Sequence, residues 1–193
     1  MKPQIVDIHT HNTINSHATI TSHGTHPWCA DEATLPLDLS EFEGVDAVGE
    51  IGLDYCCSTP PHTQQRLFEA QMEVAQRLNK IAVIHCVRAY NETLSTLSKY
   101  RLRCVIFHGF IGSAQLLREI TRRGYYVSYG ERTFSSPKTI EALRQTPLDR
   151  LFLETDQSSV DIETIYNKTA STLGVSIEAL KDIIYNNYKQ IIR

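Results

Sequence analysis

The sequence of 193 residues contains no apolar run near the ~20 residues that a helix needs to cross a bilayer. Its first residues, MKPQIVDIHTHN, also lack the apolar core of a signal peptide. Basic residues are not in excess, because 19 Lys and Arg stand against 22 Asp and Glu, for a formal net charge of −3. Proteins that coat nucleic acid without specificity are usually more basic. We therefore expect no membrane partner and no obligate protein partner, and any nucleic-acid contact should be local.

Cysteines are few, odd in number and without the spacing of a zinc ribbon. This pattern favours reduced thiols in a cytoplasmic protein over a disulfide framework. A redox pair at Cys56 and Cys57 is the functional alternative, and nothing near these residues in the sequence supports it. The five cysteines are Cys29, Cys56, Cys57, Cys86 and Cys104.

The chain has no long linker, low-complexity segment or internal repeat, and 41% of its residues are hydrophobic. We expect one domain over residues 1–193. Short apolar runs alternate with amphipathic stretches, which is typical of an α/β fold with parallel strands. Residues 10–17 and 24–45 are loop-rich, with room for only one short helix. Seven strands are predicted, at 4–9, 18–23, 46–52, 81–86, 104–108, 125–129 and 151–156.

Capping residues mark several of the expected helices. Ser113, Ser136 and Ser176 each stand where a helix N-cap is expected, and Pro137 occupies the first position after its cap. Gly124 suits the position after a helix end. Asn91 is a further candidate N-cap, for a helix over 91–100. The remaining helix is predicted over 62–79, and the one that begins at Ser176 is expected to complete the barrel wall.

Histidines and acidic residues stand at the ends of the predicted strands. In parallel α/β folds, side chains at the carboxyl ends of strands meet at one edge, where functional sites lie. Residues i and i+2 of a strand point to the same face, so His9 and His11 can act as a pair only if this segment is extended. The residues at strand ends are Asp7, His9, His11, Glu50, His85, His108, Glu154 and Asp156.

Glu50 is the most unusual of these residues, because it interrupts the apolar run VGEIGLDY. A buried carboxylate is costly unless positive charge meets it. Its neighbours Gly49 and Gly52 remove side-chain bulk, and its two oxygens can bridge two cations. A pair of divalent ions would therefore make its burial tolerable.

The motifs DIHTH, GTHPW, GEIGLDY, QxxLFEAQ, VIHC, FHGFIGS and LETD together resemble the TatD-type metal-dependent hydrolases, which are also described as TatD-related deoxyribonucleases. The match covers nearly the whole chain. The resemblance implies a distorted TIM-like (β/α) barrel with a dinuclear metal centre, and a water or hydroxide between the two ions. It implies that one ion is held by His9, His11, Glu50 and Asp156, and the other by Glu50, His85 and His108.

Three features depart from the family pattern. The chain is short and lacks one βα unit between DxHxH and the GxHP turn, which gives seven strands in place of eight. Valine stands at position 87, where the family usually has arginine, and Arg88 follows it. The segment after Asp156 runs QSSVDIE and lacks the usual proline-containing loop.

These features predict a divalent-metal-dependent phosphodiesterase, and the resemblance makes DNA ends the expected substrate. Asp156 would accept a proton from the attacking water, Glu50 would bridge the ions, and His26 and Arg88 would contact the substrate. Zn, Mn, Mg, Ni, Co and Fe all suit mixed imidazole and carboxylate ligands. Asp54 is equally suited to a structural role and to orienting a ligand. Asp7 and Glu154 are expected either to be structural or to orient ligand imidazoles.

Two alternatives stay open. The same metal site could hydrolyse a small molecule, such as a phosphomonoester, an amide or a lactone, because fold and metals do not fix the substrate. The chain could also be a non-enzymatic metal-binding protein. His17, His23 and His62 have no matching partner in the sequence and are expected in loops or at the surface.

Overall fold

The computed structural model describes residues 4–11 and 17–193, so part of the loop expected over 10–17 lies outside it. The chain forms two compact units. Residues 20–107 make the first, which we call the middle unit. Residues 1–19 and 108–193 make the second, which we call the terminal unit. Within the described residues, no helix combines the length and the hydropathy required of a membrane span.

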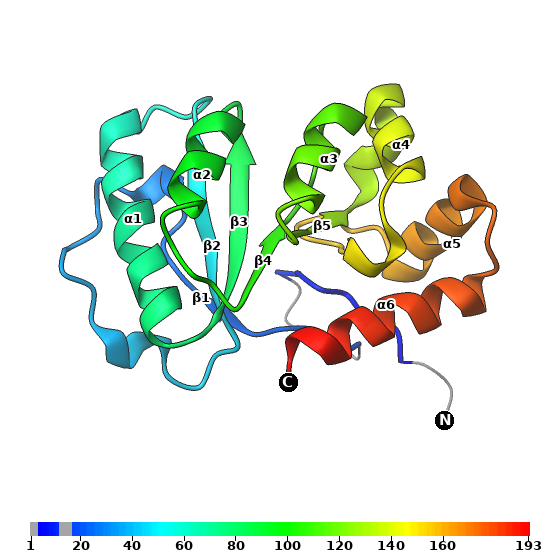
Figure 1. Ribbon diagram of the computed structural model, residues 1–193, viewed down its shortest axis with the longest axis horizontal. Helices are drawn as coiled ribbons and strands as arrows, with labels where there is room; N and C mark the ends of the chain where they lie inside the picture. The colour runs from blue at the N-terminus through cyan, green and yellow to red at the C-terminus, as the bar shows by residue number, and fades with distance from the viewer. Residues whose placement is uncertain (1–3, 12–16) are drawn as a thin grey trace. The chain divides into compact units, whose positions relative to one another are not determined.

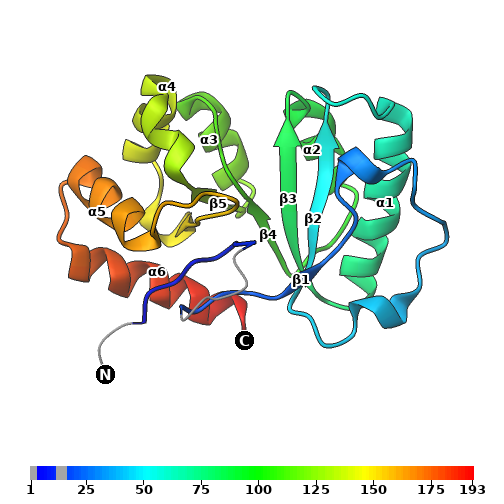
Figure 2. The same ribbon diagram turned by 180° about the vertical axis from the view of Figure 1, so that it is seen from behind.

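The middle unit is a parallel sheet whose four strands pair in chain order. In Figures 1 and 2 its two α-helices lie on the same side of these strands. Two short 3-10 helices precede β2 where one short helix was expected. The elements are β1 (Ser22–His23), η1 (Pro27–Cys29), η2 (Leu39–Phe42), β2 (Ala47–Asp54), α1 (Pro61–Arg77), β3 (Ile81–Val87), α2 (Tyr90–Leu97) and β4 (Cys104–Phe107).

The terminal unit packs four helices with two parallel strands. Neighbouring helices contact each other in chain order from α3 to α6, and α5 and α6 also contact β6. The elements are α3 (Ala114–Thr121), β5 (Tyr126–Tyr129), η3 (Glu131–Ser135), α4 (Pro137–Arg144), η4 (Leu148–Arg150), β6 (Leu151–Leu153), α5 (Ile162–Leu173) and α6 (Ile177–Ile191).

The N-terminal segment is extended, as predicted, but it makes single bridges in place of a regular strand. The amide of Ile8 donates to the carbonyl of Leu153 at 3.0 Å, and Asp156 and His9 are joined by a backbone hydrogen bond of 3.0 Å. Residues 4–11 and 17–193 therefore form six regular strands, all in parallel pairs, and not the seven predicted. The pairings within the two units do not by themselves close a barrel.

Serine caps begin the helices at the predicted places. The hydroxyls of Ser113, Ser136 and Ser176 accept hydrogen bonds from backbone amides three residues later, which confirms all three N-caps. The Asn91 cap is wrong, because α2 begins at Tyr90 after Ala89, which offers no side-chain cap. Helix α5 was missed, although Asp161 caps its start and Gly174 ends it in the left-handed conformation.

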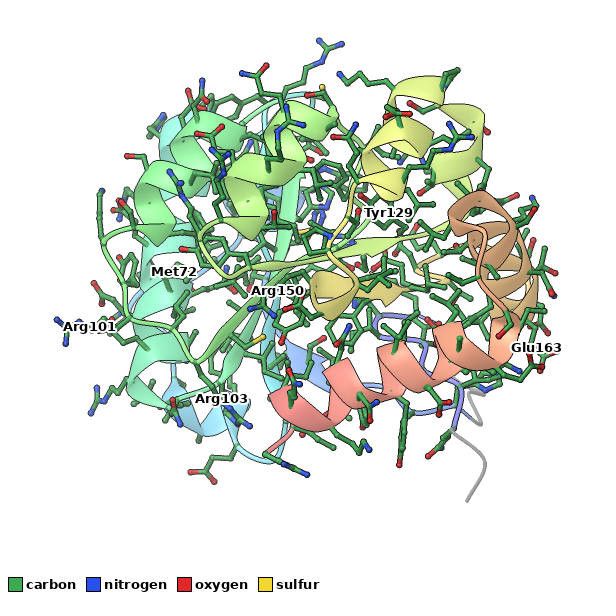
Figure 3. All side chains as sticks on the ribbon, turned by 45° about the vertical axis from the view of Figure 1, so that its right-hand side comes forward. Met72, Arg101, Arg103, Tyr129, Arg150 and Glu163 are labelled. Atoms are coloured by element: carbon green, nitrogen blue, oxygen red, sulfur yellow. The ribbon has the colours of Figure 1, made fainter. Side chains whose placement is uncertain are left out.

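Apolar side chains of the helices form the cores of the units. Leu67, Phe68 and Met72 of α1 are buried and form its apolar face. Figure 3 labels Met72 on this helix. Arg101 and Arg103, between α2 and β4, are exposed at the surface (Figure 3).

Asp7 fixes the strand end that carries Asp156. Its carboxylate accepts hydrogen bonds from the Thr155 amide at 2.9 Å and from the Thr155 hydroxyl at 2.7 Å. Burial, only partly offset by these two bonds, raises the pKa of Asp7 from 3.8 to about 6. The predicted role of Asp7 is thus structural, since it holds the backbone next to Asp156.

This raised pKa predicts a pH-dependent stability. Because its pKa is higher in the folded protein, protonated Asp7 stabilises the folded state relative to the unfolded state. This stabilisation is fully present below the unfolded pKa and is lost as pH rises through the folded pKa. Asp7→Asn can keep both contacts and does not ionise. Between about pH 3 and pH 8, the free energy of unfolding of the wild type should fall by about 3 kcal/mol relative to this variant. Urea denaturation in EDTA measures it, and a pH-independent difference would contradict the prediction.

Candidate metal centre

Glu50 lies in the middle of β2, where the strand carries one extra residue. Val48 pairs with Ala82, whereas Ile51 pairs with Ile84, so three steps along β2 match two along β3. A bulge of this kind bends a strand and redirects its side chains. The Glu50 side chain is only 10% exposed.

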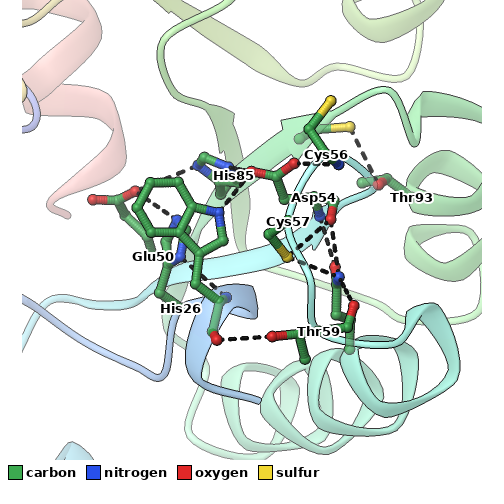
Figure 4. Close-up of polar contacts among 11 residues, drawn as sticks. His26, Glu50, Asp54, Cys56, Cys57, Thr59, His85 and Thr93 are labelled. Atoms are coloured by element: carbon green, nitrogen blue, oxygen red, sulfur yellow. Dashed lines mark hydrogen bonds and ion pairs between the residues drawn. The ribbon is translucent and has the colours of Figure 1, made fainter. Parts of the chain in front are cut away.

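Two imidazoles approach the Glu50 carboxylate within the middle unit (Figure 4). Its Oε2 atom lies 3.8 Å from Nε2 of His26 and 3.7 Å from Nδ1 of His85. The rings of His26 and His85 are 4.3 Å apart between centroids. These separations exceed ordinary hydrogen bonds. Ligand atoms that share an ion at ~2 Å from each lie about 3–4 Å from one another, so this donor set fits a divalent metal.

Two glycines make room for Glu50 and His85, as the sequence indicated. A Cβ atom on Gly49 would lie 2.5 Å from the Cβ of Val83. A Cβ atom on Gly52 would lie 2.0 Å from the carbonyl oxygen of His85, and Gly52 has φ +141°. Both positions therefore require glycine for the strands to approach.

Asp54 orients His85. Its Oδ2 atom lies 3.3 Å from Nε2 of His85 and accepts a 2.7 Å hydrogen bond from the indole N–H of Trp28. Its Oδ1 atom accepts a hydrogen bond from the Cys56 amide at 2.8 Å. Burial alone would raise the pKa of Asp54, but these bonds outweigh it and hold the pKa below its ordinary value. With Nε2 facing Asp54, Nδ1 of His85 faces Glu50 (Figure 4). Of the two roles left open for Asp54, the geometry supports the orienting one.

The glutamines of the QxxLFEAQ motif hold the loops beside this cluster. Gln64 accepts from the Asp54 amide at 2.7 Å and donates to the Asp54 carbonyl at 2.9 Å. Gln71 makes the same pair of contacts with the backbone of Thr25, at 2.6 Å and 3.0 Å. Both side chains are buried in α1, so this helix fixes the backbone that carries Asp54 and His26.

Asp54→Asn should weaken metal binding about 10–100-fold, the effect typical of losing a contact that orients a ligand. The Asp54 carboxylate faces three donors, from Trp28, Cys56 and His85, so an amide must turn its NH₂ group toward one of them. Isothermal titration with Mn²⁺ or Zn²⁺ measures the affinity. The exposed Asp31→Asn is the matched control, and equal affinities for both variants would contradict the role of Asp54.

The terminal unit brings together a second set of donors. Oδ1 of Asp156 lies 3.9 Å from Nε2 of His9 and 3.5 Å from Nε2 of His11. The rings of His9 and His11 meet edge to face with centroids 5.2 Å apart, as the i, i+2 spacing predicted. Asp156 has φ +53° and directly follows the short segment that Asp7 holds in place.

His108 and Glu154 lie beside this set. Nδ1 of His108 is 3.6 Å from Oε1 of Glu154, and the two residues join Asp156 in a group of potential ligands. Glu154 is buried and accepts a short hydrogen bond from the Ser128 hydroxyl. Burial favours a raised pKa for Glu154, but the His108, His9 and Ser128 contacts hold the pKa below its usual value. Its position supports the predicted role of orienting His108.

Each unit thus holds part of the predicted ligand set. Glu50 and His85 lie in the middle unit, and His9, His11, His108 and Asp156 lie in the terminal unit. That Glu50 bridges two ions stays a prediction. His26 was expected at the substrate, and its contact with Glu50 adds it to the potential ligands, which its place in the GTHPW turn alone did not indicate. Arg88 is exposed just after β3, with φ +53°.

The chain is thus an α/β protein with groups of imidazole and carboxylate side chains that could hold metal ions. A sequence model of the family described as "TatD related DNase" matches residues 6–193. The chain belongs to this family, which confirms the resemblance in its motifs.

Individual relatives agree with this assignment. "Uncharacterized metal-dependent hydrolase YabD" of Bacillus subtilis is 36% identical over 124 residues, which are 62% of this chain and 49% of the relative. TatD of Citrobacter rodentium, described as a 3'-5' ssDNA/RNA exonuclease, is 30% identical over 144 residues, 69% of this chain and 55% of the relative. The chain thus spans about half the length of these curated relatives.

Solved structures support the fold. The crystal structure of YJJV, a TatD homologue from Escherichia coli, superposes with a TM-score of 0.86 at 19% identity, over 99% of this chain and 98% of that one. A TatD family hydrolase from Entamoeba histolytica gives a TM-score of 0.77 at 18% identity, over 92% and 76% of the two chains. The predicted TIM-barrel-like α/β fold is confirmed.

Proposed function

We propose that this chain is a divalent-metal-dependent phosphodiesterase that cleaves single-stranded or frayed nucleic acid from an end. Both units would form one hydrolase domain. The observation that carries the proposal is the pair of imidazole and carboxylate groups, His26–Glu50–His85 and His9–His11–Asp156, each with separations that fit a metal ion.

Each residue would have a distinct role. His9, His11 and Asp156 would hold one ion, His85 and His108 the other, and Glu50 would serve both. Bound divalent cations lower the pKa of water and neutralise charge that develops on phosphate oxygens. Asp156 would accept the proton of the attacking water, and Asp54 keeps Nδ1 of His85 aimed at Glu50. His26 and Arg88 would contact the substrate phosphate, unless His26 serves as a further ligand.

The descriptions of two relatives support nucleic acid as the substrate class. The Citrobacter TatD protein is described as acting on single-stranded DNA and RNA, and human TATDN2, 37% identical over 121 residues, is described as a 3'-5' RNA nuclease. That alignment covers 57% of this chain and 16% of TATDN2. The shared family and the donor sets support a nucleic-acid substrate for this chain over an amide or a lactone.

A substrate panel tests the proposal. Purified protein with Mn²⁺, Mg²⁺ or Zn²⁺ is given an end-labelled single-stranded oligonucleotide, a bis-aryl phosphodiester, an aryl phosphate and an aryl amide. We expect stepwise shortening of the oligonucleotide from one end, and no cleavage in EDTA or with Asp156→Asn. Faster cleavage of the aryl phosphate or of the amide would contradict the proposal and favour a small-molecule hydrolase.

A further inference from the structure

Trp28 is the one tryptophan of the chain, and it stands beside the donor group of the middle unit. Trp28 is 54% exposed, more than any other large apolar residue among those that the structure describes. Its ring meets the His26 ring edge to face, with centroids 4.6 Å apart, and lies 6.3 Å from the His85 ring. A large aromatic surface therefore stands next to two imidazoles of the candidate metal site.

Three hydrogen bonds hold Trp28 in place. The indole Nε1 donates to Oδ2 of Asp54 at 2.7 Å, and the backbone amide donates to Nδ1 of His26 at 3.3 Å. The carbonyl oxygen of Trp28 accepts from the Thr59 hydroxyl at 2.8 Å. Pro27 precedes it at the start of η1. An aromatic ring that is fixed before a ligand arrives loses little conformational entropy when it binds.

Hydrophobic burial does not explain this arrangement. A tryptophan that only contributes to the core has no reason to leave half of its side chain in water, since burying apolar surface stabilises the fold. The hydrogen bond to Asp54 explains why the indole N–H points inward, but it does not explain the exposed ring. If the adjacent donor group holds the ions that bind a substrate phosphate, as proposed above, a fixed and half-exposed ring beside it suits a planar group attached to that phosphate.

We propose that Trp28 is a stacking platform for a nucleobase of the substrate, adjacent to the phosphodiester that is cleaved. This inference rests on the proposed function and extends it, because a base platform selects a nucleotide over a small phosphoester. Stacking of bases on aromatic side chains is tolerant of sequence, since every base has a π-face, and typically changes affinity about 5- to 150-fold. The proposal covers DNA and RNA alike.

Two variants separate the ring from its hydrogen bond. Trp28→Phe and Trp28→Leu both remove the indole N–H that Asp54 accepts, but only Trp28→Phe keeps an aromatic face. Binding is measured by fluorescence anisotropy in EDTA, so that no cleavage occurs, with a labelled single-stranded hexanucleotide. A hexamer of abasic tetrahydrofuran residues, with the same number of phosphates, is the control ligand.

The expected result is selective. Trp28→Leu should raise the Kd for the base-containing hexamer about 5- to 150-fold relative to Trp28→Phe, and should leave the Kd for the abasic hexamer unchanged. In the wild type, the base-containing hexamer should quench the fluorescence of Trp28 saturably, and the abasic hexamer should not. Quenching uses the unaltered protein, so it decides the matter even where a variant fails to fold.

Other outcomes would overturn the proposal. Equal binding by Trp28→Phe and Trp28→Leu would show that the tryptophan serves only to hold Asp54. Equal losses for both hexamers would show a general disturbance of the phosphate site. Failure of the proposed function gives a different result. The wild type would then cleave no phosphodiester with any metal, whether or not the hexamer quenches the fluorescence of Trp28.

Discussion

Replacing Glu50 by alanine is expected to abolish catalysis and to reduce the metal content of the protein. The Glu50 carboxylate is the acidic member of the middle unit's donor group, 3.8 Å and 3.7 Å from the nitrogens of His26 and His85. Without it, the two imidazoles retain no negative ligand of that group. Metal ions supply several kcal/mol of transition-state stabilisation, so we expect activity to fall about 10³-fold or more.

Elemental analysis and nuclease assays measure the two effects together. We expect about two ions per chain in the wild type and fewer in Glu50→Ala. Glu73→Ala is the matched control, because Glu73 is an exposed carboxylate on α1 of the same unit. Phosphodiesterase activity that survives in Glu50→Ala at the level of Glu73→Ala would contradict the assignment of Glu50.

The second large effect is expected on stability, from Gly52→Ala. The added Cβ atom would lie 2.0 Å from the carbonyl oxygen of His85, and φ at this position is +141°. Backbone strain of this kind costs about 1–3 kcal/mol, and overpacking costs about as much again. We therefore expect the free energy of unfolding to fall by about 2–6 kcal/mol, with β2 and β3 forced apart beside Glu50.

Gly44→Ala provides the control for strain alone. Gly44 also has a positive φ, +77°, but no atom lies within 4 Å of the Cβ that alanine would add. Urea denaturation of both variants compares their free energies of unfolding. If Gly52→Ala lost no more stability than Gly44→Ala, then the close approach of β2 and β3 would not require glycine.

The sequence predicted the parts of this site that depend on local pattern. Apolar runs ending in His, Asp or Glu identified the strand ends, because alternation along a strand fixes which side chains share a face. Serine caps identified three helix starts for a similar reason, since the cap is a contact within four residues. The i, i+2 relation of His9 and His11 is likewise local.

Contacts between distant residues were beyond the sequence pattern. The bond of Trp28 to Asp54 spans 26 positions, and the contact of His85 with Asp54 spans 31. The spacing of residues along the sequence does not reveal such pairs. The sequence therefore did not decide whether Asp54 is structural or orients a ligand, and it indicated His26 only as a substrate contact. Helix α5 was different, because Asp161 and Gly174 are ordinary local signals for its ends, and these were overlooked.

The central proposal is that the predicted ligands bind a pair of metal ions that share Glu50. Anomalous scattering from a crystal soaked in Mn²⁺ tests it most directly, because the method locates each ion without reference to activity. We predict two peaks about 3.5–4 Å apart, with the Glu50 carboxylate contacting both. A single peak, or two peaks of which neither lies within bonding distance of Glu50, would contradict the account.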